Sequence, residues 1–124
     1  MLDGTAELRI MTSYSFGDIV TMYIAYTRSE GGDRRPLVCF EDTGEIINGF
    51  EITKQKGNKN YAQYRYELID WKEAGCVVPS YVNLHPEDSK TLTKPDDIKY
   101  IGTLTERDQH GMNNKLQEIQ KKFS

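Results

Sequence analysis

The stretch at positions 19–26 reads Ile-Val-Thr-Met-Tyr-Ile-Ala-Tyr and directly follows Gly17-Asp18. Its β-branched and aromatic residues are the types that strands favour. The glycine and the aspartate before it are typical of a turn. We therefore predict a strand at 19–26 that begins directly after a turn.

Short runs of similar character follow it. Tyr64, Tyr66 and Leu68 alternate with polar neighbours, which indicates a half-buried strand. Asn48-Gly49 predicts a tight turn or a bulge. The further strands that we predict are 37–40, one or two strands over 46–47 and 50–53, 61–68, 77–84 and 98–104.

Polar stretches with glycine predict the loops. Residues 27–34 contain Gly31-Gly32, and we expect a mobile loop there. Pro36 is compatible with the beginning of a strand but not with a central ladder position, because it has no backbone N–H. The other long loops that we expect are 54–60 and 87–97.

A helix is predicted at the C-terminus. Thr105 is a good N-cap residue. Met112, Leu116, Ile119 and Phe123 recur at steps of four, three and four, which gives one apolar stripe. A single helical turn at 71–74 is also expected, with Trp71 holding it to the core.

These elements predict a mainly β (α+β) chain of five to seven short strands, arranged as a small, partly open barrel with a C-terminal helix. With 124 residues, we expect one domain over 1–124, with 1–14 as an irregular extension. A core of this size is often completed by dimerisation, so we expect a homodimer.

The sequence contains no apolar run long enough for a membrane span and no basic start typical of a signal peptide, so we expect a cytoplasmic protein. Cys39 and Cys76 form no metal-binding or redox motif, and Cys39 is expected to pack in the core. His85 and His110 are expected to be structural or exposed. No ligand cluster is visible, so we expect neither a metal nor a cofactor.

The net charge of −3 argues mildly against nucleic-acid binding. However, the stretch 54–65 contains four basic residues and no acidic one. Such a local basic strip can attract phosphate even on an acidic protein. The alternative is a solvated loop.

Several segments, in order, resemble the MazF/PemK toxins of type II toxin–antitoxin systems. Each is short, but the ordered set covers 16 to about 119. The segments are Phe16-Gly17-Asp18-Ile19-Val20, Arg34-Arg35-Pro36-Leu37-Val38, Ile52-Thr53, Asp70-Trp71-Lys72-Glu73-Ala74-Gly75 with Pro79-Ser80-Tyr81-Val82, and Ile101-Gly102-Thr103-Leu104 with Asp108.

The resemblance implies an SH3-like barrel, a homodimer, a cognate antitoxin as partner and sequence-dependent cleavage of single-stranded RNA. The arginine before the strand proline is catalytic in that family, which implies Arg35. A threonine that ends a strand is often its partner, which implies Thr53. The loop 27–34 would gate the entry of RNA.

Cleavage without a metal uses the 2′-hydroxyl as nucleophile and leaves 2′,3′-cyclic phosphate and 5′-hydroxyl ends. A guanidinium suits the phosphorane, because it is planar, charged and can bind two oxygens. We assign Thr53 a hydrogen bond to the phosphate or to the leaving oxygen, and the general base stays unassigned. The alternatives without a catalytic role are that Arg35 is a surface arginine beside an edge strand and that Thr53 is a strand residue with a solvated hydroxyl.

Bases stack on aromatic rings and phosphates bind cations in single-stranded RNA complexes. The stretch 54–61 offers both kinds of side chain.

Two alternatives to an RNA-cleaving toxin remain open: a gyrase-binding toxin without enzymatic activity, and an inactive SH3-like binding module. An acidic antitoxin tail could lie across Arg35 and the basic strip. The RNA-binding residues that we predict are Arg28, Arg34, Lys54, Lys56, Lys59 and Tyr61.

Overall fold

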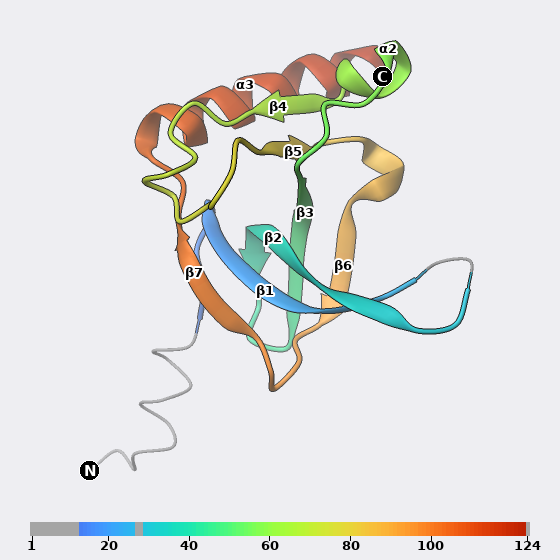
Figure 1. Cartoon of the computed structure of the whole chain (residues 1–124), viewed down its shortest axis with the longest axis vertical. Helices are drawn as coiled ribbons and strands as arrows, with labels where there is room; N and C mark the ends of the chain where they lie inside the picture. Colours follow the sequence, from blue (N-terminus) through green and yellow to red (C-terminus); the bar gives the residue numbers. More distant parts are fainter. Residues whose placement is uncertain (1–12, 27–28, 124) are drawn as a thin grey trace.

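The computed structural model describes residues 13–26 and 29–123, which form seven strands, one long helix and two short helical turns (Figure 1). Ser13 and Tyr14 of the expected N-terminal extension are described and lie outside any element. The elements are β1 Asp18–Ala25, β2 Gly32–Asp42, β3 Ile46–Thr53, α2 Lys59–Ala62, β4 Arg65–Glu67, β5 Tyr81–Asn83, η1 Pro86–Asp88, β6 Lys90–Thr93, β7 Lys99–Thr103 and α3 Glu106–Lys122.

All strand pairs are antiparallel, in the order β4-β5-β3-β2-β1-β7. One edge of β3 pairs with β2, and the other is shared, because β6 pairs with 46–49 and β5 with 52–53. The sheet therefore curves into a small barrel-like body with α3 along one end (Figure 1). The predicted mainly β fold with a C-terminal helix is confirmed.

Two clusters of buried apolar side chains lie on opposite faces of the strands. Val38 belongs to the cluster that packs under α3, whereas its neighbours Leu37 and Cys39 belong to the other. This division follows from the alternation of side chains along a strand. Cys39 is fully buried, as predicted.

Helix α3 agrees closely with its prediction. Thr105 caps it, since its side chain accepts a hydrogen bond from the Asp108 N–H. Met112, Leu116 and Ile119 are buried, whereas Phe123 at the end of the stripe is exposed. The helical turn over 70–75 is also present, and Trp71 packs against the first cluster.

The loop predicted at 27–34 is too long, because β2 already begins at Gly32. Pro36 also lies within the strand, opposite Thr21 of β1. The ladder tolerates it because pairing with β3 begins only at Leu37, so Pro36 has a strand on one side alone. Of the two alternatives predicted at Asn48-Gly49, the tight turn is wrong, because β3 runs through these residues. The register shifts opposite them, between Cys39 and Glu41 of β2, as at a bulge.

Three other boundaries were wrong. The strand predicted at 61–68 is β4 alone, because Asn58 caps the turn α2 within it. The strand predicted at 77–84 shortens to β5. The loop predicted at 87–97 contains β6, which pairs with β3 despite its polar sequence.

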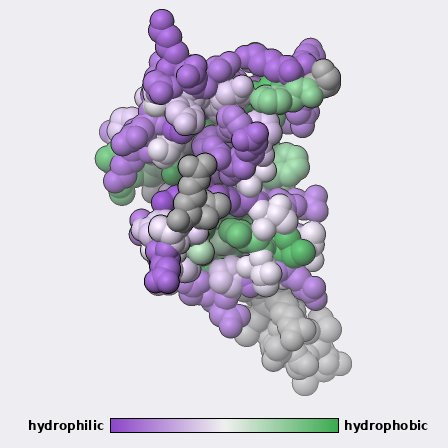
Figure 2. Space-filling view, turned by 90° about the vertical axis from the view of Figure 1, so that its right-hand side faces the viewer, coloured by the Kyte–Doolittle hydropathy of each residue, from purple (hydrophilic) through white to green (hydrophobic). Residues whose placement is uncertain are grey.

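The face in Figure 2 shows hydrophilic residues with several separate apolar patches between them. Within the described ranges, no helix has the length and apolar character needed to cross a membrane.

Candidate functional site

A pocket of about 440 Å³ opens where β2, β3, β4 and β5 present side chains on one face. The register pairs Leu37 with Glu51, and Arg35 lies two residues before Leu37, on the same face of β2. On the next strands, Arg65 pairs with Asn83. The lining residues are Arg35, Glu51, Ile52, Thr53, Lys54, Gln55, Arg65 and Asn83.

Arg35 is partly held in place. Its Nη1 donates a hydrogen bond to Oε1 of Glu51 at 3.1 Å, and its guanidinium lies 5.7 Å from the ring centre of Tyr26. Its side chain is still 40% exposed. Arg35 is therefore oriented by one carboxylate while part of its guanidinium stays open to a ligand.

Thr53 is the last residue of β3 and pairs with Tyr81. Its hydroxyl oxygen accepts a hydrogen bond from the Gln55 N–H at 3.2 Å. A hydroxyl that accepts one bond can still donate another, so Thr53 is able to donate a hydrogen bond to an oxygen in the pocket.

Arg65 is a second guanidinium in the pocket, which we did not predict as a site residue. Its Nη1 donates to the Gln55 carbonyl at 2.7 Å, and its guanidinium lies 5.9 Å from the Tyr61 ring centre. Its buried Nε finds no acceptor among the described residues. Arg65 therefore keeps unused capacity to donate hydrogen bonds.

The charges of the pocket favour an anion. Arg35, Lys54 and Arg65 are three cations, and Glu51 is one carboxylate, so the lining carries a formal charge of +2. The protein as a whole carries −3. The positive charge is therefore concentrated locally, which is what attracts a phosphodiester to an acidic protein.

Arg34 lies outside this pocket. It donates to Oγ1 and the carbonyl of Thr21, and to the carboxylate and carbonyl of Asp97. Neighbouring residues of a strand face opposite sides, so Arg34 and Arg35 cannot share one face. Arg34 fixes β2 to the turn before β7.

Of the other predicted RNA-binding residues, only Lys54 lines the pocket. Lys56 and Lys59 are exposed beside it, and Tyr61 is connected to it through Arg65. Arg28 lies outside the described residues. Glu51 and Arg65 were not predicted as site residues. Glu51 lies two residues before Thr53, on the same face of the strand, and this spacing could have pointed to it.

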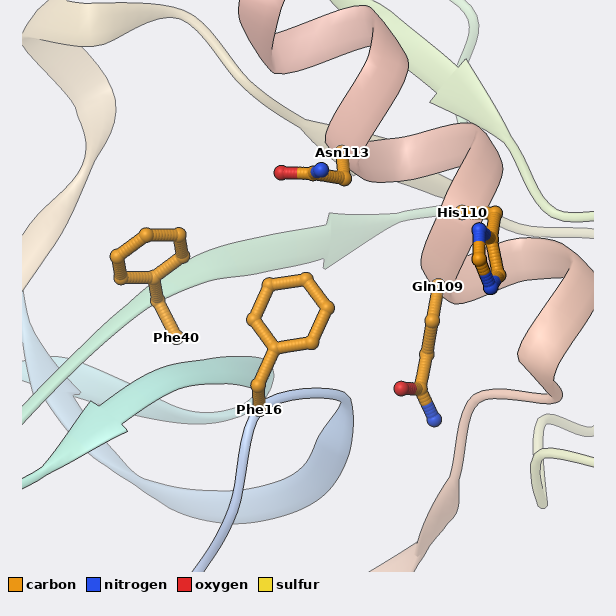
Figure 3. A pocket seen from close by; sticks show the side chains of 5 residues that line it. All are labelled: Phe16, Phe40, Gln109, His110 and Asn113. Carbon is orange, nitrogen blue, oxygen red and sulfur yellow. The ribbon is translucent and has the colours of Figure 1, made fainter.

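A second cavity, of about 370 Å³, lies on the helix side (Figure 3). Phe16 and Phe40 face Gln109, His110 and Asn113 of α3 across it, and no lysine or arginine lines it. It shares no lining residue with the pocket around Arg35. This cavity is therefore separate from the pocket and has no cation to bind phosphate.

No cysteine or histidine lines the 440 Å³ pocket. Burial, followed by the charge of Asp42, raises the pKa of Cys39 to about 12, so its thiol stays protonated. His85 accepts a hydrogen bond from the Glu87 N–H and packs against Tyr64. In the described part of the chain, no three His, Cys, Asp or Glu residues gather as metal ligands.

No protein-family model matches the sequence, and no curated protein matches it either. Solved structures match the fold. A chain of the MazE–MazF complex of Deinococcus radiodurans is 16% identical, with 88% of this chain and 97% of that chain covered, at a TM-score of 0.63. MazF of the same organism is 17% identical, with 88% of this chain and 97% of that chain covered, at a TM-score of 0.59.

An endoribonuclease bound to its cognate antitoxin, from a mycobacterial species, is 14% identical, with 88% of this chain and 96% of that chain covered, at a TM-score of 0.62. At such low identities the likeness shows the fold. The chain has the fold of the MazF structures over most of its length.

Proposed function

We propose that this chain is the toxin of a toxin–antitoxin system and a MazF-type endoribonuclease that cleaves single-stranded RNA without a metal. One observation carries the proposal. Arg35 and Thr53, to which the family resemblance gives catalytic roles, line one positively charged pocket on a chain with the MazF fold.

Each side chain has a task in this proposal. Arg35 binds the scissile phosphate and stabilises the extra negative charge of the phosphorane. Arg65 binds the same phosphate or its neighbour. Thr53 donates a hydrogen bond to a phosphate oxygen or to the leaving 5′-oxygen, and the products are a 2′,3′-cyclic phosphate and a 5′-hydroxyl.

The RNA strand extends from the pocket along residues 54–61. Lys54 binds phosphate at the rim, Lys56 and Lys59 continue the positive surface, and Tyr61 offers a ring for a base. Contacts from Arg28 and Arg34 stay predictions. These contacts would give the cleavage its sequence dependence.

The partners follow from the same surface. An antitoxin with an acidic segment would compete with RNA for the cationic pocket, which is the simplest way to neutralise it. We also propose a homodimer and a cytoplasmic location, where single-stranded messages are available.

The test is cleavage of a long single-stranded RNA in excess chelator, with mapping of the product ends. We expect discrete cuts with 5′-hydroxyl ends. Arg35→Ala should cut about 10²–10³-fold more slowly, because it removes a preorganised charge.

Arg107→Ala is the matched control. This arginine lies on α3, pairs with Asp70 away from the pocket, and should leave the cleavage rate within about twofold of wild type. RNA that stays intact with all three proteins at high excess would contradict the proposal and favour a gyrase-binding toxin or an inactive module.

A further inference from the structure

Glu51 is the one carboxylate among the residues that line the pocket. Its side chain is 17% exposed, and its Oε1 accepts the hydrogen bond from Arg35. Among the described residues, no hydrogen bond to its second oxygen, Oε2, is found. One oxygen is therefore held in place, and the other is available to a ligand.

The proposed reaction needs a group that takes the proton of the 2′-hydroxyl. The guanidinium groups of Arg35 and Arg65 are hydrogen-bond donors without an acceptor, and a threonine hydroxyl is a poor base. No histidine lines the pocket. A carboxylate at the edge of a phosphate site is the remaining group that can act as a base.

A carboxylate beside a phosphate site needs a reason, because it repels the substrate. Here cations offset the repulsion: Arg35 on β2, Lys54 after β3 and Arg65 on β4 line the same pocket. Two further charged residues contact lining residues or their neighbours in the strand. Lys90 of β6 pairs with Gly49, two residues before Glu51, and Asp88 accepts a hydrogen bond from Asn83.

We propose that Glu51 is the general base of this site, an inference that rests on the proposed function. Its carboxylate takes the proton from the 2′-hydroxyl as the 2′-oxygen bonds to phosphorus. The bond from phosphorus to the 5′-oxygen breaks, and the 5′-oxygen takes a proton from water. Arg35 thus has two tasks: it binds the phosphate and it aims the base.

The experiment uses an RNA oligonucleotide that spans one mapped cut, in chelator, under single-turnover conditions from pH 5 to 9. We expect Glu51→Gln to lower the cleavage rate about 10²–10⁴-fold at neutral pH. The wild-type rate should rise less steeply with pH than the variant rate, because the carboxylate acts as its base. The variant rate should keep rising about tenfold per pH unit, because hydroxide replaces the missing base.

Binding separates a base from a residue that only orients Arg35. An oligonucleotide with a 2′-deoxy sugar at the cut site cannot react, and Glu51→Gln should bind it as tightly as wild type or more tightly. Wild-type cleavage with an unchanged Glu51→Gln rate would overturn the inference alone. A slower rate with weaker binding and an unchanged pH profile would also overturn it, because Glu51 would then only position Arg35. A wild type that does not cleave would overturn the proposed function and this inference together.

Discussion

Two carboxylates of this molecule lie in opposite situations, Glu51 in the pocket and Asp108 under helix α3. Asp108 is fully buried and accepts hydrogen bonds from the Tyr66 hydroxyl and from the N–H groups of Ile69 and Asp70, at 2.7, 3.0 and 2.8 Å. Among the described residues, Glu51 has one hydrogen-bond partner, Arg35, and it faces a cavity. A buried carboxylate whose two oxygens both accept hydrogen bonds holds structure, whereas a carboxylate with an open oxygen in a pocket can bind a ligand.

The surroundings of Asp108 reinforce the contrast. Tyr66 crosses α3 at Gly111, where a Cβ would lie 2.2 Å from the Tyr66 hydroxyl oxygen, so any larger residue would block the approach to Asp108. Burial, then the hydrogen bond to Asp108, raises the pKa of Tyr66 above its ordinary value of 10. This tyrosine stays protonated and donates to Asp108 at all ordinary pH values.

The largest change in the free energy of unfolding is expected when Asp108 is replaced. Asp108→Ala should lower the free energy of unfolding by about 3 kcal/mol or more, because three donors each lose their buried acceptor at about 1–3 kcal/mol. Denaturant unfolding measures it, with the exposed Asp96→Ala as control, expected within about 0.5 kcal/mol of wild type. A loss below about 1 kcal/mol would show that Asp108 is not a structural carboxylate.

Asp42 extends the comparison to a buried ion pair. Its fully buried carboxylate accepts bonds from Lys94 at 2.7 Å and from the Tyr14 and Gly44 N–H groups at 2.8 Å each. Burial alone would raise the pKa of Asp42, but these bonds, that of Lys94 first, hold it below 3.8. Asp42→Asn should cost about 3 kcal/mol at neutral pH.

The sign of the pH dependence follows from the lowered pKa. The ionised Asp42 stabilises the folded state in full above the unfolded value of 3.8, and this contribution is lost as the pH falls through the folded value. Unfolding curves of wild type and Asp42→Asn should therefore converge below pH 4. A difference that stays constant from pH 7 to pH 2 would contradict this assignment.

The smallest change in the free energy of unfolding is expected at Glu51, the carboxylate in the pocket. Glu51→Gln should change the free energy of unfolding by less than about 1 kcal/mol, because the pair with Arg35 is partly exposed and solvent weakens it. Unfolding of this variant, measured beside its cleavage rate, separates stability from activity. A loss as large as that of Asp108→Ala would make Glu51 a structural carboxylate too.

The elements that the sequence predicted well are those with local signals. Helix α3 has its cap at Thr105 and its apolar stripe within one segment, and β1 has its β-branched run. Strand β6 was missed because its polar residues become a strand only through pairing with β3, some 40 residues earlier. The turn α2 was missed although Asn58 is a good capping residue.

The site was predictable in part for the same reason. Because side chains alternate along a strand, Arg34 and Arg35 lie on opposite faces of β2, whereas Glu51 and Thr53 lie on the same face of β3. That Arg65 joins them depends on β4 pairing with β5 and β5 with β3, and no local pattern encodes this register. The catalytic roles of Arg35 and Thr53 stay predictions.

Strand β1 pairs with the late strand β7, so that Asp18 lies beside Thr103. A chain emerging from the ribosome makes β1 early, but the partner for its second edge arrives some 80 residues later. Helix α3, which holds β4 through Tyr66 and Asp108, follows later still. Pairings this distant in sequence fold slowly and late. The edge of the sheet at β1 and the contact that holds β4 therefore form after all of the pocket residues, the last of which is Asn83, have been synthesised.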